Sequence, residues 1–266
     1  MPTSYQALVD DLNAQSFHKT PITCSQEQIE AAVKAFIVFM GLPEEKKFQF
    51  SARLDPNDRG TEIGYWTRRR AEGHPDDRGY FHYSEAADKQ FRPKGQDCPE
   101  LITFMDAAKI VHTAAVQKLR EIVHTIDEQH PGLEQALFAP GNGRELRLPL
   151  RFLAYTQTEP GQFLATGHYD RGACTLAVAE SAPGLRIGKT PETVKEVVHE
   201  KGYGLFFPGA YLPEFTNETF APSWHDVVQK DQDVFQANYA RWAIVLFASA
   251  WDRQVLSWDA CHTPKY

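Results

Sequence analysis

Residues 164–178, LATGHYDRGACTLAV, are the most informative stretch of the chain. The pattern predicts a strand that ends near Asp170, a tight turn, and a second strand from Cys174. Because alternate side chains of a strand point to the same face, His168 and Asp170 face the same way. This strand end therefore presents an imidazole and a carboxylate together, beside a turn.

The His-x-Asp spacing alone is a weak signal, because a chain with 10 histidines can contain it as a chance surface pair. His225, far downstream, can add a second imidazole to the same site. Two histidines and one carboxylate form a triad that leaves open positions on iron(II), as a metal that binds both substrate and dioxygen requires. We therefore expect His168, Asp170 and His225 to hold one metal ion at the mouth of a barrel-like fold.

Upstream of this stretch, residues 1–140 are mainly helical in pattern. Ser25 and Gln28 fit a capping box at the start of one helix. Pro99 opens the strongest helix, whose apolar residues recur at helical spacing and predict a face packed on a sheet. Residues 51–97, rich in Asp, Pro, Gly and Arg, are predicted to be irregular.

From residue 144 onward the apolar residues recur with a period of two, and Pro-Gly turns separate the candidate strands. Short strands separated by such turns predict a mainly β fold with N-terminal helices, in which a double-stranded β-helix (jelly-roll) core carries a helical layer. Residues 1–140 form the helical region and residues 141–266 the core, together one cooperative unit. The alternation starts at residues 146–152, and the later candidate strands are residues 163–169, 173–179, 184–187, 204–207 and 241–249.

The composition limits the function classes. The chain has 28 Lys and Arg against 35 Asp and Glu, a net charge of −7, and this acidic balance argues against a nucleic-acid partner. Its four cysteines form no Cys-x-x-Cys pair, which is typical of reduced thiols inside a cell. No signal peptide is visible, and no apolar run approaches the ~20 residues that span a bilayer. We expect a cytoplasmic protein without a nucleic-acid or membrane partner.

Arg241 begins an otherwise apolar strand, where a buried guanidinium is costly unless it meets an anion. The structural alternative is an Asp or Glu of the protein itself. The functional alternative is a substrate carboxylate, held by two parallel N–H groups. The residues alone leave both alternatives open.

The ordered series of motifs resembles the iron(II)- and 2-oxoglutarate-dependent dioxygenases, in the branch that includes isopenicillin N synthase and the plant-type oxygenases. This chain has the His-x-Asp of that branch at residues 168–170, followed by its Thr-Leu at residues 175–176. The resemblance spans residues 30–250, and the ordered series is far more specific than any single motif. The other matching segments are residues 42–46, 64–65, 150–155, 184–187, 208–210, 216–217, 223–227 and 241–243.

The resemblance implies an oxidoreductase whose catalytic centre is Fe(II) on His168, Asp170 and His225. It also implies 2-oxoglutarate as co-substrate, with its distal carboxylate held by Arg241 and a hydrogen bond from Tyr155. Dioxygen and a small organic molecule would be the other substrates, and the outcome would be hydroxylation, desaturation or ring closure.

Two departures from the family pattern keep alternatives open. Ala243 replaces a Ser that helps to hold the 2-oxoglutarate carboxylate, and Asp226 replaces an Arg after the second histidine. A 2-oxoglutarate-independent Fe(II) oxidase of the same fold, or one that uses ascorbate, is therefore an alternative. A non-catalytic metal-binding or small-molecule-sensing domain is another, although the intact triad favours catalysis.

Overall fold

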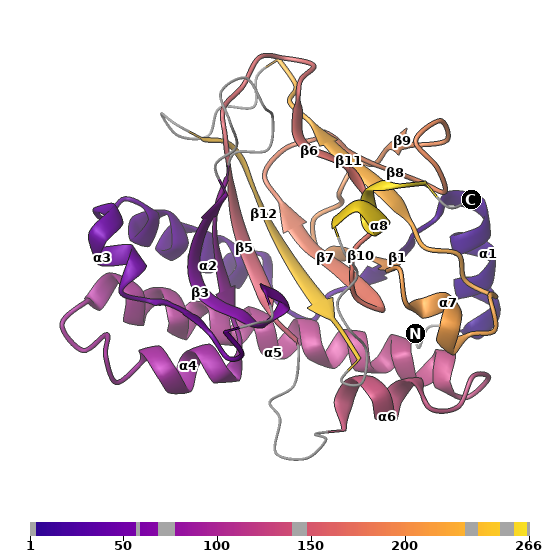
Figure 1. Ribbon diagram of the computed structural model, residues 1–266, viewed down its shortest axis with the longest axis horizontal. Coiled ribbons are helices and arrows are strands. Elements are labelled where there is room, and N and C mark those ends of the chain that lie inside the picture. The colour runs from indigo at the N-terminus through magenta and orange to yellow at the C-terminus, as the bar shows by residue number, and fades with distance from the viewer. Residues whose placement is uncertain are drawn as a thin grey trace.

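The structure, a computed structural model, describes residues 4–56, 59–68, 78–139, 148–231, 239–250 and 258–264. Its strands form one sheet of eight strands and one sheet of four. Figure 1 shows helices α4 (Glu85–Phe91) and α5 (Pro99–Asp127), in magenta, below the strands of the larger sheet. The expected combination of β-sheets with N-terminal helices is confirmed.

The larger sheet joins strands from both ends of the chain, and its strand pairings are antiparallel in the described residues. The order is β1-β10-β7-β12-β5-β4-β3-β2, so N-terminal strands flank the C-terminal ones on both sides. The strands are β1 (His18–Pro21), β2 (Ser51–Arg53), β3 (Glu62–Arg68), β4 (Arg78–Tyr83), β5 (Leu150–Thr156), β7 (Cys174–Glu180), β10 (Tyr203–Pro208) and β12 (Tyr239–Ala248).

The smaller sheet has the order β6-β11-β8-β9. Its strands are β6 (Phe163–His168), β8 (Leu185–Gly188), β9 (Lys195–Glu196) and β11 (Trp224–Val228). From β5 onward the chain passes repeatedly between the two sheets, because β5, β7, β10 and β12 belong to the larger one. The two sheets are therefore built from interleaved segments of the sequence.

The helices begin where the sequence predicts. Ser25 caps α2 (Gln26–Met40) in a capping box with Gln28, and Pro99 is the first residue of α5. None of the described helices is both long and apolar enough to cross a membrane. The others are α1 (Tyr5–Gln15), α3 (Glu44–Phe48), η1 (Arg59–Thr61), α6 (Leu133–Phe138), α7 (Leu212–Phe215) and α8 (Trp258–His262).

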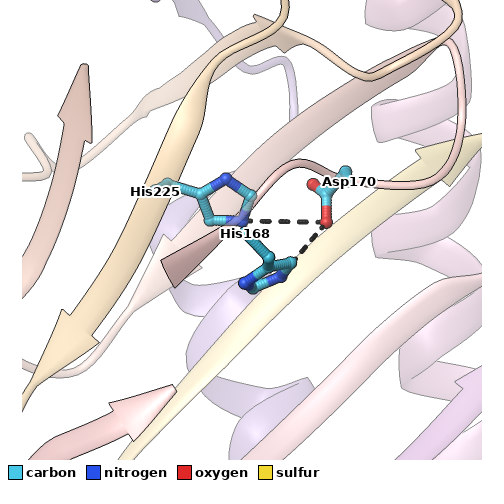
Figure 2. A group of neighbouring side chains, drawn as sticks. All are labelled: His168, Asp170 and His225. Atoms are coloured by element: carbon cyan, nitrogen blue, oxygen red, sulfur yellow. Dashed lines mark ion pairs between the residues drawn. The ribbon is translucent and has the colours of Figure 1, made fainter. Parts of the chain in front are cut away.

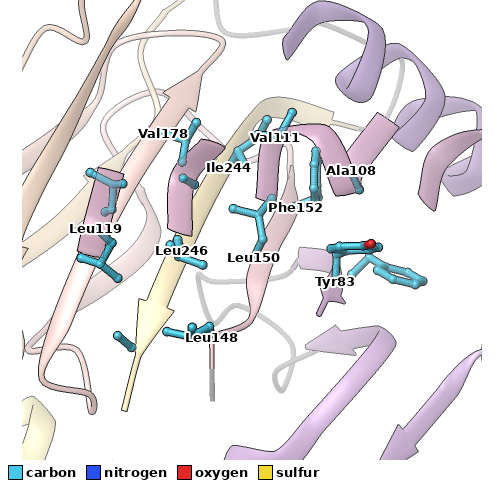
Figure 3. Packing of buried hydrophobic residues seen from close by; sticks show 14 of the residues in the cluster. Tyr83, Ala108, Val111, Leu119, Leu148, Leu150, Phe152, Val178, Ile244 and Leu246 are labelled. Atoms are coloured by element: carbon cyan, nitrogen blue, oxygen red, sulfur yellow. The ribbon is translucent and has the colours of Figure 1, made fainter. Parts of the chain in front are cut away.

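Helix α5 packs along one face of the larger sheet, as its apolar pattern predicts. Each fully buried Leu, Val or Phe in such a layer stabilises the fold by about 1.5–3 kcal/mol. Figure 3 shows this packing: Ala108, Val111 and Leu119 come from α5, and Leu150, Phe152, Val178, Ile244 and Leu246 come from the sheet.

The opposite face of the larger sheet is turned toward the smaller sheet. Leu153 of β5 and Ala243 of β12 belong to a second apolar cluster, together with Ala165 and Val227 of the smaller sheet. Along β5, alternate side chains therefore serve two different environments: Leu150 and Phe152 face the helices, while Arg151, Leu153 and Tyr155 line a cavity between the sheets.

The prediction that residues 51–97 are irregular is wrong for the described part of that segment. Strands β2, β3 and β4 extend the larger sheet beyond β5, and α4 follows them. Their buried Tyr65 and Phe81 alternate with polar residues such as His82, whose ring is hydrogen-bonded inside the fold. The buried polar side chains of β4 therefore mark a second interior face of the sheet. Strands β1 and β11 were not predicted either.

Candidate metal centre and its cavity

The two histidines of the predicted triad lie on neighbouring strands of the smaller sheet. His168 ends β6, His225 lies near the start of β11, and the two residues face each other in the register of the strand pair. Asp170 follows two residues after His168. Figure 2 shows both imidazole rings turned toward the carboxylate. The structure therefore brings together the three residues that sequence reasoning selected.

The ligand atoms are close enough to share one ion. Nε2 of His168 lies 3.6 Å and Nε2 of His225 lies 3.7 Å from Oδ1 of Asp170. Both distances are shorter than the separation that one metal ion can bridge, and the three ligand atoms form one cluster. An ion about 2.0–2.2 Å from each ligand atom can bridge pairs up to about 4.4 Å apart. The donor set of two imidazoles and one carboxylate therefore fits a single transition-metal ion.

Hydrogen bonds to the backbone orient both rings. Nδ1 of His168 donates to the carbonyl of Thr166 at 2.8 Å, and Nδ1 of His225 donates to the carbonyl of Ser223 at 3.2 Å. With the protons on Nδ1, both Nε2 atoms keep their lone pairs for a metal. The second oxygen of Asp170 accepts from Oγ1 of Thr175 at 2.5 Å, which leaves Oδ1 for the ion.

Burial favours the ligand form of the first histidine. It lowers the pKa of His168 well below its usual range, and the neighbouring His225 lowers it further. The imidazole is therefore neutral at pH 7, which is the form that binds a metal.

One further residue beside this centre was not predicted from the sequence. His262 of α8 stacks on His168, with ring centroids 5.4 Å apart and an interplanar angle of 13°. The backbone N–H of Tyr169 donates to the carbonyl of Cys261 and fastens α8 beside β6. No motif spacing connects His262 with the triad, so sequence reasoning had no signal for it.

The triad opens into a cavity between the two sheets. The space free of protein atoms measures about 600 Å³, including the solvent at its mouth. Its apolar walls include Leu153, Phe207 and Val245, and three arginines line it: Arg78, Arg151 and Arg241. Tyr155 and Arg241, the residues expected to hold a co-substrate, therefore share the cavity with the metal ligands.

Arg241 is fully buried and forms an ion pair with Glu180 of β7. Its guanidinium carbon lies 5.7 Å from the ring centroid of Tyr155. Nε and Nη1 of Arg241 and Oε1 of Glu180 have no hydrogen-bond partner in the described part of the chain. The structural alternative for Arg241 is thus present, and two N–H groups remain to donate to a ligand.

Arg151 has a different partner. Its Nε donates to Nε2 of His82 at 2.6 Å, and Nδ1 of His82 donates to the carbonyl of Glu62 at 2.9 Å. The guanidinium also lies over the rings of Tyr80 and Phe247, at 5.1 Å and 4.6 Å. Burial lowers the pKa of Arg151, yet an arginine remains charged at any physiological pH.

The departure at Asp226 has a local explanation. Arg186 on the neighbouring strand β8 donates two hydrogen bonds to Asp226, at 2.6 Å and 2.8 Å. Asp226 is not among the residues that line the cavity. The residue after the second histidine therefore supports the smaller sheet and leaves the metal centre unchanged.

No protein-family model matches this chain. No curated protein matches it either. Several solved structures do match. A full-length Neurospora crassa protein, solved in complex with alpha-KG and 5-formyluracil, aligns with a TM-score of 0.68 at 20% identity, over 92% of this chain and 77% of that one.

Two more solved structures show the same likeness. Arabidopsis thaliana AtDAO1, a dioxygenase for auxin oxidation in its 2-oxoglutarate complex, aligns with a TM-score of 0.69 at 16% identity, over 94% of this chain and 89% of that one. JOX2 in complex with 2OG, Fe and JA aligns with a TM-score of 0.63 at 16% identity, over 94% of this chain and 72% of that one. The chain therefore has the fold of these 2-oxoglutarate/Fe(II) oxygenases.

Proposed function

We propose that this protein is a non-haem Fe(II) oxygenase that couples oxidative decarboxylation of 2-oxoglutarate to the oxidation of a small organic molecule by dioxygen. The observation that carries the proposal is the convergence of His168, Asp170 and His225 on one cavity. A triad of this kind covers one side of a metal ion and leaves the cavity side for exchangeable ligands. The likeness to the Neurospora crassa protein and to AtDAO1, both solved with the co-substrate, supports it.

The protein's own residues have distinct roles in this proposal. The triad holds Fe(II), and the bound metal with its co-substrate supplies the oxidising chemistry. Arg241 binds the distal carboxylate of 2-oxoglutarate through the N–H groups that have no partner among the described residues. Tyr155, beside that guanidinium, is proposed to donate a hydrogen bond to the same carboxylate. The apolar walls exclude water from the reacting centre.

A second function has one observation in its favour. Glu180 already neutralises Arg241, and Ala243 offers no hydroxyl beside it. An Fe(II) oxidase that takes its electrons from the substrate or from ascorbate would not need a carboxylate anchor at this position. The two functions differ in whether 2-oxoglutarate is consumed.

We also propose that strands β5–β12 form a double-stranded β-helix, or jelly roll, because these strands divide between two facing sheets in alternation. Residues 1–140 and 141–266 are proposed to fold as one cooperative unit. This is supported by the larger sheet, which contains strands from both regions. A cytoplasmic location without membrane or nucleic-acid partners stays a prediction.

Turnover without a prime substrate tests the function. Protein loaded with Fe(II) should convert 2-oxoglutarate slowly to succinate in the presence of dioxygen. Asp170→Ala should abolish this conversion, whereas Asp106→Ala, which removes an exposed carboxylate on α5, should not change it. Dioxygen consumption without succinate would favour the 2-oxoglutarate-independent oxidase. Equal activity of the two variants would contradict the metal assignment.

A further inference from the structure

Arg151 lies near the metal end of the cavity. In the β5–β12 pair, Arg151 is opposite Val245. Two residues further along β12, Phe247 is opposite Thr175 of β7. Thr175 in turn donates to Asp170. Arg241, by contrast, faces Tyr155, four residues further along β5. At about 3.4 Å per residue, the backbones of the two arginines are roughly 14 Å apart along the strands.

The guanidinium of Arg151 is held in place from one side. Its Nε is bound to His82, whose other nitrogen is bound to the backbone of β3, so the hydrogen-bond chain ends on a rigid strand. The guanidinium also lies over the rings of Tyr80 and Phe247. The two terminal nitrogens, Nη1 and Nη2, make no hydrogen bond to any described residue. Arg151 therefore presents two fixed donors to the cavity.

The positive charge of Arg151 has no carboxylate partner among the described residues. Described carboxylates of the cavity and of the neighbouring strand have other partners. Asp170 is a proposed metal ligand, Glu180 pairs with Arg241, and Glu62 accepts hydrogen bonds from Arg53 and Tyr80. Arg78, which also lines the cavity, adds a second positive charge. A half-buried cation without a counter-ion is unfavourable, so the cavity is suited to an incoming anion.

We propose that Arg151 binds the carboxylate of the prime substrate, which is an organic acid with an apolar body. This inference rests on the proposed function, because the substrate must be held beside the metal while 2-oxoglutarate uses Arg241. Two parallel N–H groups match the two oxygens of a carboxylate. The apolar body then lies against Phe247, Val245 and Phe207, with the latter ring 5.0 Å from that of His225.

A matched pair of probes tests this specificity. Phenylacetate and phenylacetamide have nearly the same shape and differ in charge. Their binding is measured by calorimetry, without dioxygen and with saturating Fe(II) and 2-oxoglutarate. The wild-type protein should prefer the acid by roughly 10- to 150-fold, the value of a charge-assisted hydrogen bond. Arg151→Gln should lose this preference, and Arg151→Lys should keep part of it.

The control is Arg120→Gln on α5, which also removes a half-buried arginine that lies over an aromatic ring. It should leave the preference for the acid unchanged. Thermal unfolding of each variant shows whether it is folded. No preference for the acid in the wild-type protein, including no binding of either probe, would overturn the proposal. It would also be overturned if Arg151→Gln weakened 2-oxoglutarate binding and left phenylacetate binding intact.

Failure of the proposed function gives a different result. If Fe(II) and 2-oxoglutarate form no charge-transfer band, the co-substrate assignment fails, and the probes are then titrated into protein with Fe(II) alone. A preference for the acid that depends on Arg151 would survive that outcome. If the band forms and the acid is not preferred, only the inference about Arg151 fails.

Discussion

Arg241 and Arg151 both come from the larger sheet and line the same cavity, yet the charges around them differ. Arg241 is fully buried and is neutralised by Glu180. Arg151 is hydrogen-bonded to the neutral His82, so its positive charge is not neutralised by this partner. We infer that the partner of an arginine in this cavity, and not its burial alone, determines what the arginine can bind.

The largest effect is expected from Arg241→Met, because it leaves Glu180 as an unpaired buried charge. Loss of one member of a buried ion pair costs roughly 3–5 kcal/mol of unfolding free energy. Chemical denaturation should show this loss, and the double variant with Glu180→Met should recover most of it. Both variants should fail to bind 2-oxoglutarate while still binding Fe(II). Unchanged 2-oxoglutarate binding would make Arg241 a purely structural residue, and the co-substrate assignment would then be dropped.

Glu180→Gln should act in the opposite direction on binding. It frees the guanidinium of Arg241 and removes a negative charge next to the proposed position of the 2-oxoglutarate carboxylate. A charge-assisted hydrogen bond of about 1.5–3 kcal/mol becomes available to the ligand, so the Kd for 2-oxoglutarate should fall at least tenfold. Anaerobic titration measures the Kd. A weaker affinity would mean that Glu180 orients Arg241 for the ligand.

The charge of Arg151 should be visible in the titration of its partner. Burial lowers the pKa of His82 well below its usual range, and Arg151 lowers it further. Since the unfolded chain binds a proton at His82 near pH 6.5 and the folded chain does not, unfolding free energy should fall as the pH drops below about 6.5. Arg151→Gln should raise the pKa of His82 and weaken this acid sensitivity.

Histidine NMR titration checks this expectation. His112 serves as the internal control, because burial lowers its pKa without any contribution from Arg151. A variant in which the pKa of His82 does not move would show that Arg151 contributes little charge to this part of the cavity.

The smallest effect is expected from Ala243→Ser. The hydroxyl would restore one neutral hydrogen bond to the 2-oxoglutarate carboxylate beside Arg241, a gain of about 1 kcal/mol, or several-fold in Kd. Uncoupled succinate formation at low 2-oxoglutarate concentration reports the change. The same substitution should leave the affinity for phenylacetate unaltered, because Arg151 lies at the other end of the cavity. An equal effect on both ligands would show that the two ends are not independent.

The sequence predicted the parts of the fold that depend on local pattern. The capping box at Ser25, the long helix from Pro99 and the strands around residues 163–180 were all predicted close to their observed bounds. Strand β4 was missed because side chains on both of its faces are buried, so polar residues such as His82 interrupt the apolar alternation. Strands β2 and β3 were missed because most of their residues are only partly buried and many are polar. β11 was missed because a short strand after a turn-rich stretch has too few residues to show a period.

The triad was predictable and the charge pattern of the cavity was not. His168 and Asp170 are local in sequence, and the order of motifs selected His225. Arg151 alternates with apolar residues and so has the pattern of a solvent-facing residue, although its face of β5 lines the cavity. Glu180 meets Arg241 beside a register shift between β7 and β12, and no pattern in the sequence predicts such an irregularity.

Anaerobic titration of the wild-type protein with Fe(II), with and without 2-oxoglutarate, tests the central claim most directly. A metal-to-ligand charge-transfer band should appear only when both are present, at one Fe(II) per chain. It should be absent in Asp170→Ala, whereas Asp106→Ala should retain it. Fe(II) binding without any band at saturating 2-oxoglutarate would contradict the co-substrate assignment. Fe(II) binding that survives the loss of Asp170 and of both histidines would contradict the metal centre itself.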